Sequence, residues 1–291
     1  MEGRNRPSST IELPVANGQI QLFTVEESPI MAAGLAAKYP AIKTYRIFGI
    51  DDPATSGRLS ISPKGLNAML TGPSGTFYID AQSEGVYSAY RRNKQQSVEP
   101  FNCGVSGHTH QTPLGDDIAS RPAYRTPGSL LVYRLAVAAT SEYISSVGGT
   151  TQAALDAIVI AINRVNQIYE RDLGIRLVLI DNNDALLESG FDYTNYNEVA
   201  MLGENQQNID NVILNENYDI GHVFGTGGGG IAEVGSVCNQ YKKAGGATGL
   251  PNPTGDAFYI DYVAHEMGHQ FSAEHSFNGT TSSCAAPNRW Q

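Results

Sequence analysis

The sequence is poor in cysteine, in basic residues and in long apolar runs. It contains only three cysteines in 291 residues, and no two of them have C-x-x-C spacing, so neither a cysteine-built zinc site nor a thioredoxin-type motif is expected. No apolar run approaches the roughly 20 residues that a membrane-spanning helix needs. The 19 Lys and Arg residues against 29 Asp and Glu give a formal net charge of −10, which argues against a nucleic-acid partner. The chain is long enough for two globular domains.

The most informative stretch runs from His265 to His275 and reads H-E-x-x-H-x-x-S-x-x-H. His265 and His269 are four residues apart, so a helix places both imidazoles on one face, where they can bind the same Zn²⁺. Glu266 lies about 100° round that helix from His265, where it can accept a proton from a water activated by the metal. His275 is too far along to continue this face, so the chain must turn after His269 if it is to supply a third ligand.

The extended motif resembles that of the metzincin zinc endopeptidases, H-E-x-x-H-x-x-G-x-x-H. The surrounding residues 261–271, together with Asn278-Gly279, are most similar to the reprolysin-like bacterial secreted branch. This resemblance implies one catalytic Zn²⁺ bound by three histidines and a glutamate general base for peptide hydrolysis. One position departs from the pattern, because Ser272 replaces the turning glycine, and a non-glycine residue at positive φ costs about 1 kcal/mol or more.

Other interpretations of the motif remain open at this point. A short H-E-x-x-H match also arises by chance, and a zinc site can serve stability alone, although such a site has no need of Glu266. A gluzincin peptidase would require a downstream glutamate as the third ligand, and none follows Glu274.

Residues 1–100 predict a β-rich domain, because short apolar alternations are separated by Gly, Pro and Ser. Strands are expected at residues 45–50, 59–62, 66–70, 77–79 and 86–90. The alanine-rich residues 29–38 predict a short helix. The resemblance implies that this domain is a pro-region, joined by a polar, Gly- and Pro-containing linker at residues 101–127.

Residues 128–291 predict an α/β domain with a mixed, partly parallel sheet, a long helix and a zinc-binding helix. The expected order is a strand at 130–139, a helix at 150–173, a strand at 175–180, a helix near 205–214 and a strand at 219–224. A strand, helix and strand at this spacing form a βαβ unit. The order is similar to the N-terminal lobe of a metzincin. No methionine occurs after Met267, so the family's methionine-containing turn and C-terminal lobe are expected to be absent from this chain.

The three cysteines fall into two groups. Cys103 begins a Cys-Gly-Val sequence that resembles the cysteine switch of metzincin propeptides, in which a thiolate fills the open zinc position until the pro-region is removed. Cys238 and Cys284 flank the zinc helix, and either a disulfide between them or two reduced thiols fits this arrangement.

A glycine-rich stretch before Cys238 resembles the edge strand that pairs with substrate in reprolysin-like enzymes. An open edge can bind an extended peptide of any sequence through main-chain hydrogen bonds. The alternative is a glycine-rich hairpin. The residues expected in the edge strand are Gly230, Ile231, Ala232, Glu233, Val234 and Gly235.

These observations favour a zinc endopeptidase precursor that acts on proteins or peptides. The alternative is a catalytically silent fold of the same kind, with a structural zinc site and a binding role. The first ten residues lack the apolar segment of a signal peptide. The resemblance nevertheless implies secretion, so a targeting segment is expected to be missing from this chain.

Overall fold

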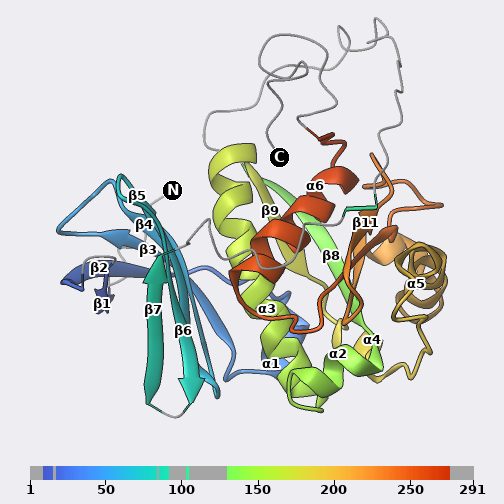
Figure 1. The fold of residues 1–291 in the computed structure, drawn as a ribbon, viewed down its shortest axis with the longest axis horizontal. Coiled ribbons are helices and arrows are strands. Elements are labelled where there is room, and N and C mark those ends of the chain that lie inside the picture. Colours follow the sequence, from blue (N-terminus) through green and yellow to red (C-terminus); the bar gives the residue numbers. More distant parts are fainter. Residues whose placement is uncertain (1–8, 16–17, 84, 92–102, 105–129, 276–291) are drawn as a thin grey trace, which may run out of the picture.

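The computed structural model describes residues 9–15, 18–83, 85–91, 103–104 and 130–275. They form an N-terminal antiparallel sheet and a second part in which helices cover a mixed sheet (Figure 1). The elements of the N-terminal part are β1 (Ser9–Pro14), β2 (Ile20–Glu27), α1 (Ala33–Lys38), β3 (Lys43–Gly49), β4 (Ser56–Ser62), β5 (Gly65–Gly72), β6 (Gly75–Ser83) and β7 (Val86–Arg91). The elements of the second part are β8 (Leu131–Ala139), α2 (Ser141–Ser146), α3 (Thr151–Ile168), η2 (Tyr169–Leu173), β9 (Ile175–Leu179), α4 (Asp184–Glu188), α5 (Glu198–Ile213), η3 (Asn215–Asn217), β10 (Ile220–Gly225), β11 (Gly229–Ala232), β12 (Gly246–Gly249), η4 (Ala257–Ala264) and α6 (His265–Gln270).

The seven strands of the N-terminal sheet lie in sequence order, and each pairs antiparallel with the next. Side chains alternate between the two faces, so one face gathers the apolar residues. The buried residues of this small core are Leu13, Phe23, Ile47, Leu59, Ala68, Leu70, Phe77 and Ile79. The five strands expected between residues 45 and 90 are present as β3 to β7. Most of these strands are longer than the apolar runs that predicted them.

The helix predicted at residues 29–38 is shorter in the structure. α1 begins at Ala33, and the residues before it are extended. The reason is a β-bridge in which Met31 pairs in parallel with Leu179 of β9. A pairing with a distant strand therefore overrides the local preference of this alanine-rich segment for a helix.

The second sheet has five strands in the order β11, β12, β10, β8, β9. Neighbouring strands from β9 to β12 are parallel, whereas β11 runs antiparallel to β12 and forms one edge. β8, α3 and β9 make the predicted βαβ unit. The predicted class, a mixed, partly parallel sheet with helices that follows a β-rich region, is therefore confirmed.

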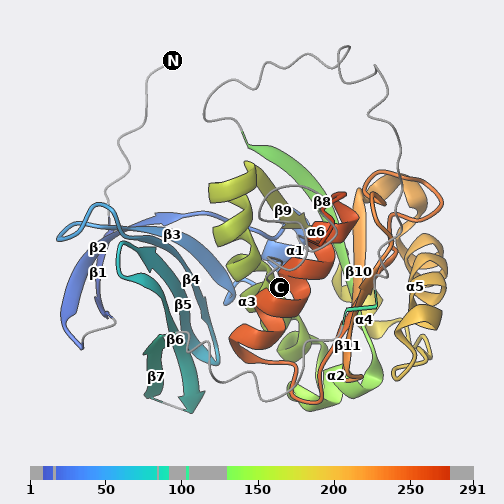
Figure 2. The same ribbon diagram turned by 45° about the horizontal axis from the view of Figure 1, so that its top comes forward.

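α3 lies between the two sheets (Figures 1 and 2). It begins where the Thr150 hydroxyl accepts a hydrogen bond from the Ala153 N–H at 3.1 Å, and the chain turns at Gly174 with a φ of 64°. Residues 154–167 are all buried, so both sides of the helix are covered. Neither α3 nor any other helix in the described ranges has the length and apolarity needed to cross a membrane.

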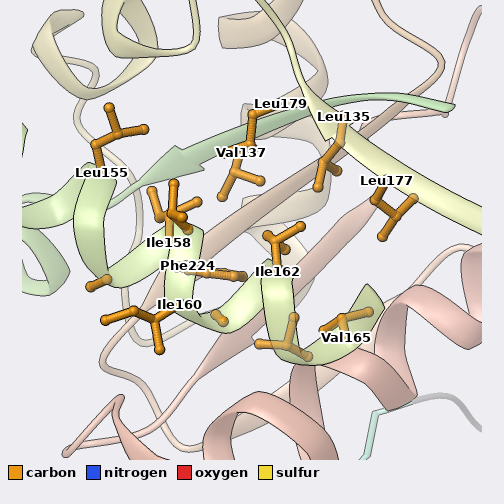
Figure 3. Close-up of a cluster of buried hydrophobic side chains, with 14 of the residues drawn as sticks. Leu135, Val137, Leu155, Ile158, Ile160, Ile162, Val165, Leu177, Leu179 and Phe224 are labelled. Carbon is orange, nitrogen blue, oxygen red and sulfur yellow. The ribbon is translucent and has the colours of Figure 1, made fainter. Parts of the chain in front are cut away.

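The apolar side of α3 packs on the second sheet and forms the main core (Figure 3). Side chains of α3, β8, β9 and β10 meet there. The residues labelled in the figure are Leu155, Ile158, Ile160, Ile162 and Val165 of α3, Leu135 and Val137 of β8, Leu177 and Leu179 of β9, and Phe224 of β10.

α5 begins earlier than residues 205–214 predict. The Asn197 side chain accepts a hydrogen bond from the Ala200 N–H at 3.2 Å, which caps the first turn. The first turns carry four consecutive apolar residues, at positions 199–202, and a continuous apolar run does not by itself show the period of a helix. The strand predicted at 219–224 is present as β10.

Leu35 of α1 allows a direct test of the contact between the two parts. Its side chain is fully buried in the main core although it precedes the second sheet by about 100 residues in the chain. We expect Leu35→Ala to lower the free energy of unfolding by about 2–5 kcal/mol, because it leaves a cavity there. Urea denaturation followed by circular dichroism measures the effect. Leu131→Ala, at a side chain that is 43% exposed, is the matched control and should change stability by less than about 1 kcal/mol.

Candidate metal centre

α6 carries the first two histidines of the motif. It continues η4 and lies between α3 and β11 (Figure 2). The Nε2 atoms of His265 and His269 are 2.9 Å apart, because residues four apart share one side of a helix. The Tyr169 hydroxyl donates a hydrogen bond to the Ala264 carbonyl at 2.7 Å. This contact ties the start of α6 to the segment that follows α3.

A left-handed turn at Ser272 ends α6. The N–H groups of Ala273 and Ser272 donate to the carbonyls of Gly268 and His269, both at 2.9 Å. This is the Schellman arrangement, which usually has glycine at the left-handed position. Ser272 adopts a φ of 74°, so the residue that departs from the family pattern still makes the turn. The turn brings the Nε2 of His275 to 3.2 Å from the Nε2 atoms of both helical histidines.

The three imidazoles fit a tetrahedral zinc ion. With Zn–N bonds of about 2.0–2.1 Å, ligand nitrogens in a tetrahedron lie about 3.3–3.4 Å apart, close to the observed 2.9–3.2 Å. The Nδ1 of His269 lies 2.6 Å from the Ala273 carbonyl and must carry a proton to donate to it. The Nε2 of neutral His269 therefore presents a lone pair to the other two imidazoles, as a metal ligand requires.

Cys103 completes a group of four side chains that together could hold a metal ion. Its sulfur lies 3.5 Å from the Nε2 of His269, and the ligand atoms of Cys103, His265, His269 and His275 all lie within 4.8 Å of one another. A zinc ion with a Zn–S bond of about 2.3 Å would place sulfur and nitrogen about 3.5–3.6 Å apart. Cys103 also forms a parallel β-bridge with Gly230 of β11.

Glu266 lies beneath the edge strand with its side chain fully buried. Burial raises its pKa to about 8, and the neighbouring Cys103 thiol opposes this rise. No nitrogen or hydroxyl of the described residues donates a hydrogen bond to either carboxylate oxygen. A Cβ atom at Gly230 would overlap this carboxylate, so the absence of a side chain there makes room for Glu266. A cation held by the adjacent imidazoles would lower the pKa of Glu266 again.

Burial keeps the three histidines neutral. It lowers the pKa of His265 to about 4, and the nearby imidazoles of His269 and His275 add to the effect. Burial also lowers the pKa of His269 and that of His275. Neutral imidazole is the form that binds metal ions, so these environments favour coordination at neutral pH.

A second buried network holds the end of α6. The Gln270 side chain donates to the Gly221 carbonyl at 3.0 Å, and its oxygen lies 3.0 Å from the Nδ1 of His222. The Nε2 of His222 lies 2.8 Å from the Thr248 hydroxyl. Burial lowers the pKa of His222 to about 4. His222 therefore acts as a neutral structural residue that joins β10, β12 and α6.

The edge strand β11 is shorter than predicted. Gly230, Ile231 and Ala232 lie in it, whereas Glu233, Val234 and Gly235 lie outside it, at a turn. The N–H groups of Gly235 and Val237 donate hydrogen bonds to the carbonyls of His269 and Gln270 at 3.0 and 3.2 Å. The segment after β11 therefore pairs with carbonyls that the end of a helix leaves without a partner in the helix.

Of the other two cysteines, only Cys238 lies within the part of the chain that the structure describes. Cys238 has an exposed, free thiol and a φ of 63°. Cys284 lies outside the described residues, so the possible disulfide between them stays a prediction.

Comparison with known families adds an independent observation. Residues 155–276 match the family model described as Metallo-peptidase family M12B Reprolysin-like. Over these residues the chain is similar to the reprolysin-like metallopeptidases. The match covers α3 from Leu155 onwards, the strands β9 to β12 and the whole histidine motif. No curated protein matches the chain. The resemblance to reprolysin-like metzincins is therefore confirmed, while the bacterial secreted branch stays a prediction.

Two sets of contacts that hold the histidine helix in place were not predicted from the sequence. The Gln270 network and the Tyr169 hydroxyl bond join segments that lie far apart along the chain. Gln270 did carry a signal, since it directly follows His269 and an amide buried in a helix needs polar partners.

Ser272 provides a test of how the third histidine is positioned. We expect Ser272→Gly to keep zinc affinity and Ser272→Val to lower it at least about tenfold, because a β-branched residue disfavours the left-handed conformation. Competition with a chromogenic chelator measures the zinc affinity of each variant. Equal affinity in the glycine and valine variants would show that the turn does not position His275.

Proposed function

We propose that this chain is the latent form of a zinc-dependent endopeptidase. Its reprolysin-like family supports a metallopeptidase, and the convergence of His265, His269 and His275 on one point beside Glu266 carries the finer proposal. The N-terminal sheet acts as the pro-region in this proposal, and export of the protein is part of it.

The three histidines would bind the zinc ion and Glu266 would act as general base. Zinc bound there supplies a Lewis acid that polarises the scissile carbonyl and makes water easier to deprotonate. A Glu266 oxygen accepts one proton from water as the water oxygen attacks the carbonyl carbon. The same carboxyl then gives this proton to the amide nitrogen as the carbon–nitrogen bond breaks, which regenerates the carboxylate.

The edge strand β11 would hold the substrate backbone. The Gly230 carbonyl already accepts a hydrogen bond from the Gly104 N–H at 2.8 Å, so this edge can pair with an extended segment. Main-chain pairing binds peptides of many sequences and presents the backbone to Glu266 directly below.

Cys103 would maintain the latent state. Its sulfur lies within 4.8 Å of a ligand nitrogen of each histidine and 3.5 Å from the Nε2 of His269, and a thiolate is a strong zinc ligand. The adjacent Gly104 pairs with the strand proposed to bind substrate. One short segment would therefore block both the metal and the peptide-binding edge.

A catalytically silent fold with a structural zinc site is less well supported. Such a site does not require a carboxylate, yet Glu266 is fully buried and the structure leaves space for it at Gly230. Burying a carboxyl group without nitrogen or hydroxyl donors is costly, and a role as general base accounts for its position beside the histidines.

Glu266→Gln tests the proposed chemistry. The substitution removes the base but no zinc ligand, so zinc stoichiometry should remain one per chain while peptide hydrolysis falls by about 10²–10⁴-fold. Metal analysis and a fluorogenic peptide assay on an active form measure these quantities. Glu216→Gln, on η3, is the control and should keep both. Hydrolysis near the unsubstituted rate in Glu266→Gln would show that Glu266 is not the base.

Cys103→Ser tests latency and can be followed without activity. Replacing zinc with Co²⁺ in the full chain should give a thiolate-to-cobalt charge-transfer band, which Cys103→Ser removes and Cys238→Ser retains. The serine variant at position 103 should also show peptidase activity without processing. A charge-transfer band that survives in Cys103→Ser would exclude Cys103 as the fourth ligand.

A further inference from the structure

The segment between β2 and β3 completes the second sheet. The Ala32 N–H donates to the Leu179 carbonyl at 2.8 Å, and the Leu179 N–H donates to the Ile30 carbonyl at 2.7 Å. These bonds pair the outer edge of β9 at its last residue, Leu179, where unpaired backbone groups would otherwise promote association with other chains.

The same segment also fills the main core. Ile30, Leu35 and Ile42 are at most 1% exposed and belong to one apolar cluster with side chains of β8, β9 and α3. α1 accordingly lies beside β9, within the second part of the molecule (Figure 2). Loss of this segment would expose an apolar surface of matching size on the second part.

A buried arginine on α3 provides one polar contact between the two sheets. Arg164 is 2% exposed and binds Asp80 of β6. Its guanidinium carbon lies 5.2 Å from the ring centroids of both Tyr78 and Tyr259, so a tyrosine from each part contacts it. Removing the N-terminal sheet would leave this cation without its carboxylate.

A second buried arginine belongs to the N-terminal sheet and contacts α3 and the residues that follow it. Arg58 of β4 is 1% exposed, binds Glu170, and donates to the Asn163 side chain at 2.9 Å. Asn163 in turn donates to the Ser60 hydroxyl at 2.9 Å. Polar side chains of α3 therefore form hydrogen bonds and an ion pair with strands of the N-terminal sheet.

Cys103 and Gly104 contact the second part at a different place, at β11 and the histidines. Gly104 donates one backbone hydrogen bond to Gly230, and the Cys103 sulfur lies at the histidines. The contacts that would block the site are thus separate from those that hold the N-terminal sheet.

We propose that α3 and the edge of β9 form a permanent docking surface for residues 9–91 of this chain. These residues remain bound after the chain is cut on both sides of Cys103, and only the short segment that carries Cys103 leaves. The claim that loss of this segment makes the enzyme active rests on the function proposed above. The claim that residues 9–91 stay bound does not.

Two nicked forms of the full chain test this proposal. One carries a recognition sequence for a site-specific protease between residues 104 and 130. The other carries this sequence and a second one between residues 91 and 103. After cleavage under native conditions, light scattering and native mass spectrometry should find both large fragments in one particle, and only the doubly cut form should lose the Cys103 segment.

The outcomes separate the association from the proposed function. Separation of the two large fragments at micromolar concentration, whether the second fragment stays folded or aggregates, would overturn the docking proposal. A persistent particle that hydrolyses peptides only after the double cut is the expected result. A persistent particle without activity would support docking and contradict the proposed latency or peptidase function.

Asp80→Ala tests whether the buried network carries the association. It leaves Arg164 buried without a carboxylate, so the dissociation constant of the nicked particle should rise by about a hundredfold or more. Asp172→Ala is the matched control, because Asp172 pairs with Arg171 where both side chains are more than 40% exposed. Equal dissociation constants for the two variants would show that the Arg164 pair does not hold the parts together.

Discussion

The convergence of three imidazole nitrogens to within 3.2 Å of one another is the constraint on which the rest of the site depends. Lone pairs at this distance repel, so the fold must hold the rings in place until a cation neutralises the repulsion. Helical spacing fixes two rings, and the left-handed turn at Ser272 positions the third. The Ala273 carbonyl orients the ring of His269, while Gln270 anchors the helix to the sheet. Such supporting contacts determine how accurately a metal site is formed.

The sequence predicted the features that depend on local spacing. Apolar alternation located the strands of the N-terminal sheet, and the four-residue interval placed His265 and His269 together. Features made by distant contacts were not predictable in this way. Nothing near Met31 indicates that it pairs with Leu179, and the packing of Gly230 over Glu266 requires two segments to meet. The Cys-Gly-Val sequence suggested a role for Cys103, but only the fold brings its sulfur to the histidines.

The two kinds of contact between the N-terminal sheet and the second part have different physical effects. Apolar side chains such as Leu35 supply binding free energy without a strict requirement on orientation. The buried ion pairs add little net stability compared with apolar replacements, but a mismatched arrangement would leave charges unpaired. Arg58 and Arg164 therefore act mainly to select one orientation of the sheet against α3.

The extended segment at Met31 has a consequence for the order of folding. All strand pairs of the N-terminal sheet join neighbours in sequence, so that sheet can form soon after it leaves the ribosome. The second sheet must join β8 to β10 across a much longer stretch of chain, and such non-local pairing is slow. When β9 emerges, the Met31 segment already lies between two paired strands, β2 and β3, and is available to pair with Leu179. Synthesis from the N-terminus thus provides a template for the slower half of the molecule.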